Sequence, residues 1–133
     1  MTYALDTNII IHLLHGNLTV RDNRDKIIKQ NANIIIPPIV DYEMRRGFLC
    51  KSTPAKEKEY NLLCNYYSVG RITSKILEQG VKVYADLYKK RLTIGELDIL
   101  IAAFCIANNY TFVTDNTKHF KNIEGLLFVN WNE

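Results

Sequence analysis

The chain opens with MTYALDTNIIIHLLH (residues 1–15), and this stretch decides the fold. Residues 2–6 form a short, largely apolar run, which predicts a buried strand that ends at Asp6. Residues 8–15 follow with the apolar spacing of a helix. Thr7 and Asn8 stand where their side chains could cap that helix. A strand that passes directly into a helix is the repeating unit of parallel α/β sheets.

The same alternation of strand and helix continues along the chain. Further strands are predicted at 33–36, 111–114 and 126–130, and helices at 18–30, 37–48, 54–67, 74–90, 93–109 and 118–120. Thr93 and Glu96 have the spacing of a capping box, in which the two side chains bond the first free N–H groups of a helix. The pattern predicts a single α/β domain, residues 1–133, with a central parallel sheet covered by helices on both faces.

Two of the predicted helices have apolar positions that we expect to face the core. In the helix at 54–67 these are Leu62, Leu63, Tyr66 and Tyr67. In the helix at 74–90 they are Ile76, Leu77, Val81, Tyr84, Ala85 and Tyr88, which follow helical spacing.

The composition, 47% hydrophobic and 23% charged residues, is that of an ordinary globular domain. No apolar run approaches the roughly 20 residues that span a bilayer, and the first residues do not have the pattern of a signal peptide. The three cysteines have no Cys-x-x-Cys spacing, so we expect reduced thiols in a cytoplasmic protein without a membrane partner. His12, His15 and His119 form no zinc motif, and we expect surface or packing roles for His12 and His15.

Four carboxylates stand where strands end or helices begin: Asp6, Glu43, Asp98 and Asp115. Asp6 and Asp115 close two predicted strands, and the carboxyl ends of parallel strands are where α/β sheets bind ligands. Carboxylates repel one another, so a cluster of them is unfavourable unless a cation offsets the charge. Oxygen ligands of this kind suit Mg²⁺ or Mn²⁺, and enzymes commonly use these ions in reactions of phosphate groups.

Several neighbours of the four acids are candidates for supporting roles. They are Thr7, Asn8, Glu96 and Asn116 as residues that assist the metal site, and Arg45, Arg46 and Lys118 as contacts to phosphate. The chain has 17 basic and 14 acidic residues. Setting the four carboxylates aside leaves ten acidic residues and an excess of seven positive charges, which favours a polyanion as the substrate.

Four motifs together resemble the PIN-domain ribonucleases, and specifically the VapC toxins of bacterial and archaeal toxin–antitoxin pairs. They are LDTN (5–8), EMRRG (43–47), IGELDILIAA (94–103) and VTDN (113–116). The resemblance spans essentially the whole chain.

This resemblance implies a PIN-like three-layer fold and endonucleolytic cleavage of RNA, often tRNA or ribosomal RNA, that arrests translation. It also implies that Asp6, Glu43, Asp98 and Asp115 hold Mg²⁺ or Mn²⁺, with Thr7 in support. A homodimer and a cognate antitoxin, whose C-terminal segment blocks the acidic pocket, are expected as well.

Other readings of the same residues stay open. A housekeeping PIN nuclease of RNA maturation would have the same acids, and so would a PIN module that binds RNA or protein without cleaving. A phosphatase with an aspartyl nucleophile would need a second acid two residues after Asp6, where Asn8 stands.

Overall fold

Four short strands lie side by side in the order β2-β1-β3-β4, and every neighbouring pair is parallel. The computed structural model describes residues 1–133. The strands are β1 (Thr2–Leu5), β2 (Asn33–Ile35), β3 (Thr111–Val113) and β4 (Phe128–Val129). The predicted parallel sheet is therefore confirmed, although its last strand is shorter than the range expected from the sequence.

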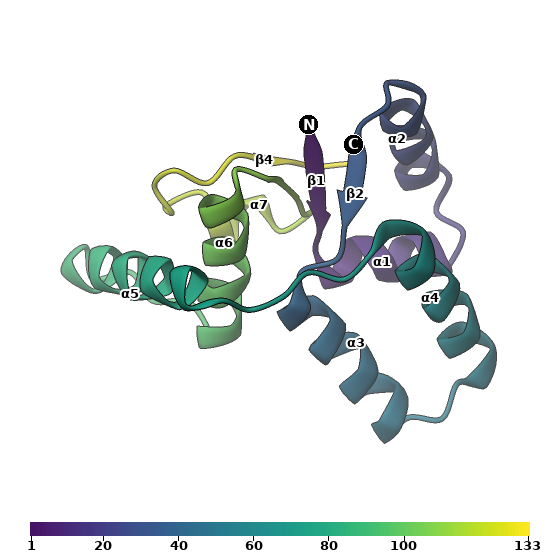
Figure 1. Ribbon diagram of the computed structural model, residues 1–133, viewed down its shortest axis with the longest axis horizontal. Coiled ribbons are helices and arrows are strands. Elements are labelled where there is room, and N and C mark those ends of the chain that lie inside the picture. Colours follow the sequence, from purple (N-terminus) through teal and green to yellow (C-terminus); the bar gives the residue numbers. More distant parts are fainter.

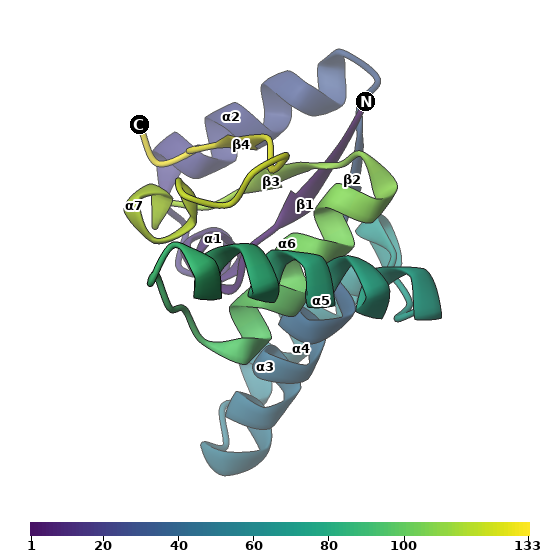
Figure 2. The same ribbon diagram turned by 90° about the vertical axis from the view of Figure 1, so that its left-hand side faces the viewer.

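Seven helices connect and cover the strands. They are α1 (Thr7–Leu14), α2 (Leu18–Lys29), α3 (Pro38–Cys50), α4 (Pro54–Tyr67), α5 (Ser74–Lys89), α6 (Glu96–Asn108) and α7 (Thr117–Phe120). Helix α6 packs against β3, and α5 packs against the outside of α6. Helix α2 lies on the opposite side of the sheet from α5 and α6 (Figures 1 and 2). The sheet is thus the middle layer of the predicted three-layer α/β domain. No helix combines the length and the apolar character needed to cross a bilayer.

The order of the strands places a topological switch at the centre of the sheet. From β1 the chain crosses to β2 on one side, whereas β3 and β4 lie on the other side of β1. The carboxyl ends of β1 and β3 therefore meet where the connections diverge, the place where open α/β sheets bind ligands. The arrowheads of β1 and β2 point towards α3 and α4, which extend beyond this edge (Figure 1).

The exposed face of α5 differs from the expectation. Its buried residues are Ile76, Gly80, Val83 and Leu87, which follow helical spacing and pack towards α6. Of the set predicted to face the core, Ile76 alone is buried, while Leu77, Val81, Tyr84 and Tyr88 are exposed. Apolar spacing identifies a helix face that is buried against something. It does not show whether that face packs against the core of the same chain or against another molecule.

Two further local expectations need correction. In α4 Tyr67 is buried as expected and Tyr60 is buried as well, but Leu62 and Tyr66 are exposed. Helix α6 begins at Glu96 after Gly95, with no capping side chain, so the capping box does not form. The helix starts two residues later than the box requires, and Asp98 consequently falls in its first turn.

Candidate active site

Asp6 is the buried centre of the site. It follows the last residue of β1, is 7% exposed, and its backbone N–H bonds the Val113 carbonyl of β3. The Thr114 hydroxyl donates to Asp6 Oδ2 at 2.7 Å, and the Thr7 N–H donates to Asp6 Oδ1 at 2.8 Å. Asp6 is therefore the N-cap of α1, a role that the sequence had suggested for Thr7 and Asn8.

The environment of Asp6 opposes its negative charge. Burial raises the pKa of its carboxyl from 3.8 to about 6, against the lowering effect of the hydrogen bonds from Thr114 and Thr7. The negative charges of Asp98 and Glu43 raise the pKa of Asp6 further. Asp98 and Glu43 are thus close enough to Asp6 for the three charges to repel. A cation beside Asp6 would offset both the burial and the repulsion.

Glu43 reaches the site from the middle of α3. The Thr7 hydroxyl donates to Glu43 Oε1 at 2.9 Å, which gives Thr7 a contact with each of two acids. On its other side Glu43 Oε2 lies 3.9 Å from Arg46, one turn further along α3. Pro38 begins this helix without a capping side chain, as its missing N–H allows.

Asp98 lies in the first turn of α6, where the helix dipole favours a negative charge. Its one hydrogen-bonding partner is His119 of α7, whose Nε2 lies 2.7 Å from Asp98 Oδ2. An ionised carboxylate can only accept, so the imidazole Nε2 is the donor. Both side chains are about one-third exposed, at 32% each.

Asp115 follows β3 by two residues and is paired in the same manner. His12, in the last turn of α1, places its Nε2 2.7 Å from Asp115 Oδ2. This is again the one hydrogen bond that the carboxylate accepts, and again the imidazole donates. The neighbouring Thr114 binds Asp6, so Asp115 follows directly on the residue that holds the centre of the site.

Each of the four acids therefore accepts a hydrogen bond from one donor side chain of another element. The pairs are Asp6 with Thr114, Glu43 with Thr7, Asp98 with His119 and Asp115 with His12. Sequence analysis missed Thr114 and the functional placement of His12 and His119. Thr114 stands next to Asp115 at a strand end, and this position was the signal that could have identified it.

The other predicted site residues have different surroundings. Asn8 Oδ1 is buried and accepts no hydrogen bond, so its acceptor is unpaired. Arg45 is bound to Asp41 at 3.0 Å and lies over the Tyr60 ring, which gives it a structural role in α3 and α4. Three predicted residues are exposed and make no side-chain hydrogen bond or ion pair: Glu96, Asn116 and Lys118.

The carboxylates fit a hard divalent cation by their chemistry. Oxygen donors are the ligands that Mg²⁺ and Mn²⁺ prefer, and the unpaired Asn8 Oδ1 could accept a hydrogen bond from a water on such an ion. As the side chains stand, no three His, Cys, Asp or Glu residues are near enough to one another to hold a metal ion. The carboxylates of Asp98 and Asp115 are turned towards their histidines instead.

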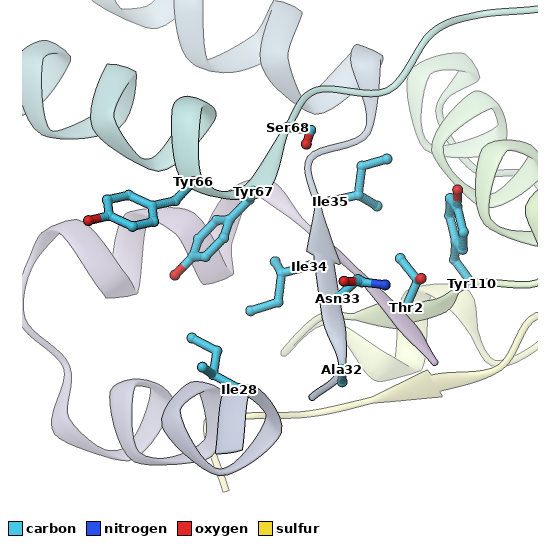
Figure 3. Close-up of a pocket in the computed structure, with 10 residues that line it drawn as sticks. All are labelled: Thr2, Ile28, Ala32, Asn33, Ile34, Ile35, Tyr66, Tyr67, Ser68 and Tyr110. Atoms are coloured by element: carbon cyan, nitrogen blue, oxygen red, sulfur yellow. The ribbon is translucent and has the colours of Figure 1, made fainter. Parts of the chain in front are cut away.

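A cavity of about 400 Å³ leads away from the acids between α1, α3 and the start of α4. Thr7 and Glu43 line one part of it, and its other lining residues include Met44, Phe48 and Lys56. A second cavity, of about 370 Å³, lies along the free edge of β2 (Figure 3). Its lining has no carboxylate, histidine or basic side chain, so it is separate from the candidate site.

Comparison with known proteins gives consistent results. The PIN domain family model matches residues 3–126. Ribonuclease VapC2 of Rickettsia felis is 31% identical over 138 residues, and the match covers all of both chains. A crystal structure of VapBC2 from Rickettsia felis bound to a promoter DNA fragment superimposes with a TM-score of 0.92 at 30% identity and covers 98% of this chain and 99% of that one. VapBC-1 from nontypeable Haemophilus influenzae gives a TM-score of 0.89 at 26% identity, with both chains fully covered.

Proposed function

Because the chain belongs to the VapC family of PIN-domain ribonucleases, we propose that it is a metal-dependent endoribonuclease and the toxin of a toxin–antitoxin pair. The observation that carries the proposal is the gathering of acids around Asp6. Burial and two neighbouring carboxylates raise the pKa of Asp6 to about 6, which is costly unless a cation is bound there. Such a cluster at the switch point of a parallel sheet favours metal-assisted chemistry on a phosphate.

Four residues would hold Mg²⁺ or Mn²⁺: Asp6, Glu43, Asp98 and Asp115. When bound, the ion supplies activation of a water and neutralisation of charge on the phosphate. Thr114 and Thr7 keep the carboxylates of Asp6 and Glu43 in place through their hydroxyl groups. The buried acceptor Asn8 Oδ1 is available to orient a water near Asp6.

The charges around the acids suit an RNA backbone. Arg46 lies beside Glu43 with its side chain half exposed, and Lys118 is exposed three residues after Asp115. Arg45 is less suited, because Asp41 already pairs its charge. Basic side chains at the rim of an acidic site attract a phosphate chain and bring one phosphate to the centre. We expect a structured RNA of the tRNA or ribosomal RNA class, whose cleavage would inhibit translation.

The cavity beside Glu43 suits a peptide from the antitoxin. Its walls combine apolar side chains with Lys51 and Lys56, and it begins at Thr7 and Glu43. A C-terminal antitoxin segment could lie in this cavity and cover the acids. The VapBC names of the two similar solved structures support a paired protein of this kind.

A homodimer is the assembly that we expect, and α5 offers the surface for it. Leu77, Val81, Tyr84 and Tyr88 form an exposed apolar stripe along this helix, with Val81 69% exposed and the two tyrosine rings stacked at 6.4 Å. A cavity of about 520 Å³ lies beside the stripe, between α5 and α6. Large apolar patches on a soluble protein usually mark an interface.

Incubation of the purified protein with labelled total cellular RNA in Mg²⁺, in Mn²⁺ and in EDTA tests the proposal. We expect discrete fragments with either ion and none in EDTA. Intact RNA under all three conditions, from folded protein free of antitoxin, would contradict the nuclease and favour a binding module.

A further inference from the structure

Asp98 and Asp115 are each bound by a histidine, whereas Asp6 and Glu43 are not. Asp6 accepts hydrogen bonds from Thr114 and Thr7, and Glu43 has Thr7 and the nearby Arg46. Asp98 and Asp115 each accept one hydrogen bond, and in both cases the donor is an imidazole Nε2 at 2.7 Å. Without the histidine, each of these partly exposed carboxylates would have no hydrogen bond from the protein to hold its orientation.

His119 is itself held by the hydrophobic core. Its ring packs edge-on against Phe120 at 5.1 Å, and Phe120, which is 1% exposed, packs edge-on against Phe112 of β3 at 4.9 Å. This aromatic chain connects the sheet to the imidazole. These contacts hold the Nε2 donor of His119 in place relative to β3. Its hydrogen bond to Oδ2 then sets the orientation of the Asp98 carboxylate of α6.

His12 is held by α1, the helix on which most of the site depends. Asp6 caps this helix, Thr7 in its first turn binds Glu43, and His12 in its last turn binds Asp115. Ile9, Ile10 and Leu13 bury the helix in the core, and this burial fixes its rotation. One rigid element therefore orients three carboxylates from three different parts of the chain.

We propose that His12 and His119 are positioning residues, which aim Asp115 and Asp98 at the metal ion through Nε2–H donors. Each histidine engages Oδ2 of its acid, so the other carboxylate oxygen stays available as a ligand. Carboxylates that bind metals are commonly oriented by hydrogen bonds of this kind. The inference rests on the proposed metal-dependent function.

Mn²⁺ affinity, measured by calorimetry and by the electron paramagnetic resonance signal of free Mn²⁺, tests this role without any substrate. We expect His119→Ala and His12→Ala each to weaken Mn²⁺ binding by about tenfold. We expect His119→Gln to restore binding to within about threefold of the wild type, because the amide nitrogen of glutamine can donate from nearly the position of Nε2. Asn122→Ala, a neutral and exposed change three residues beyond His119, is the control and should bind as the wild type does.

Other outcomes would overturn the proposal in distinct ways. Unchanged binding by both alanine variants would mean that the histidines do not position the acids, and tighter binding would mean that they compete with the metal. Equal losses in His119→Ala and His119→Gln would make the imidazole a direct ligand. Asp98→Asn separates this inference from the proposed function. If Asp98→Asn also binds Mn²⁺ normally, the metal site itself is wrong.

Discussion

Asp6 carries a charge that the folded protein disfavours, and this makes a prediction about pH. A carboxyl whose pKa is raised in the folded state binds a proton more tightly there than in the unfolded chain. Its ionisation therefore lowers stability progressively as the pH rises from about 4 to above 6. The difference between the pKa of about 6 and the ordinary value of 3.8 corresponds to about 3 kcal/mol at neutral pH.

We therefore expect Asp6→Asn to stabilise the protein by about 1–3 kcal/mol at pH 7.5 in EDTA, while abolishing metal-dependent cleavage. The gain should shrink towards zero at pH 4, where the wild-type carboxyl is protonated in the folded protein. Urea denaturation at the two pH values measures this difference. The exposed Asp22→Asn is the control, with a change below about 0.5 kcal/mol. A gain of equal size at both pH values would contradict the raised pKa.

Thr114 is fully buried, and its hydroxyl both donates to Asp6 and accepts from the Asn116 N–H. Thr114→Val keeps the shape but removes both hydrogen bonds, so we expect a loss of about 1–3 kcal/mol in the free energy of unfolding. We also expect RNA cleavage to fall by roughly 10- to 100-fold, because Asp6 loses its orienting donor. Thr114→Ser keeps the hydroxyl and should retain most of the activity. Equal activity of the valine and serine variants would show that the hydroxyl is not needed.

The segment between α4 and α5 makes a prediction about packing. Gly70 bonds the Ile36 carbonyl beside β2 and lies against α6, where an added Cβ would come within 2.6 Å of Phe104 Cε1. Phe104 is 2% exposed and cannot move aside freely. We expect Gly70→Ala to cost about 1–3 kcal/mol, measured as the free energy of unfolding.

Gly47 provides the matched comparison for Gly70. It lies inside α3 with nothing within 4 Å of an added Cβ. Gly47→Ala should therefore stabilise the protein by about 0.5–1 kcal/mol, through helix propensity alone. If both alanine variants changed stability in the same direction, the packing of the 68–70 segment against α6 would be wrong.

The sequence predicts most of the helices and strands, and the order of the elements, but it does not predict which side chains bind the four acids. Asp6 and Asp115 follow strands, and parallel strands bring such residues to one edge, so that convergence follows from the order of elements. The contact of His12 with Asp115 joins residues 103 positions apart and depends on the rotation of α1, which no local pattern specifies.

The apolar stripe of α5 shows a second reason why the sequence does not fully predict which residues are buried. Helical spacing identified Val81 and Tyr84 as residues that need cover, but both are exposed in the single chain. Core and interface have the same spacing and the same residue types, so periodicity cannot separate them. The core side of α5 includes Gly80, which a search for large apolar residues does not count.

For the molecule as a whole, the exposed stripe predicts the oligomeric state. Val81→Glu places a charge in the proposed dimer interface, and we expect it to convert a dimer to a monomer, or to raise the dissociation constant by at least about tenfold. Light scattering after size-exclusion chromatography gives the mass. Lys82→Glu introduces an acid next to the stripe and should leave the dimer intact. A wild-type monomer, or a Val81→Glu dimer, would contradict the assignment of this face.

The central claim is that the gathered carboxylates carry out metal-dependent cleavage of RNA. Cleavage by wild type and by Asp98→Asn, at equal concentrations in Mg²⁺ and Mn²⁺, tests it most directly. Asp86→Asn, which removes an acid of α5 paired with Lys90, is the control. We expect the wild type and Asp86→Asn to produce the same fragments and Asp98→Asn to produce none, with all three proteins folded. Cleavage by Asp98→Asn at the wild-type rate would show that the acids around Asp6 are not the catalytic centre.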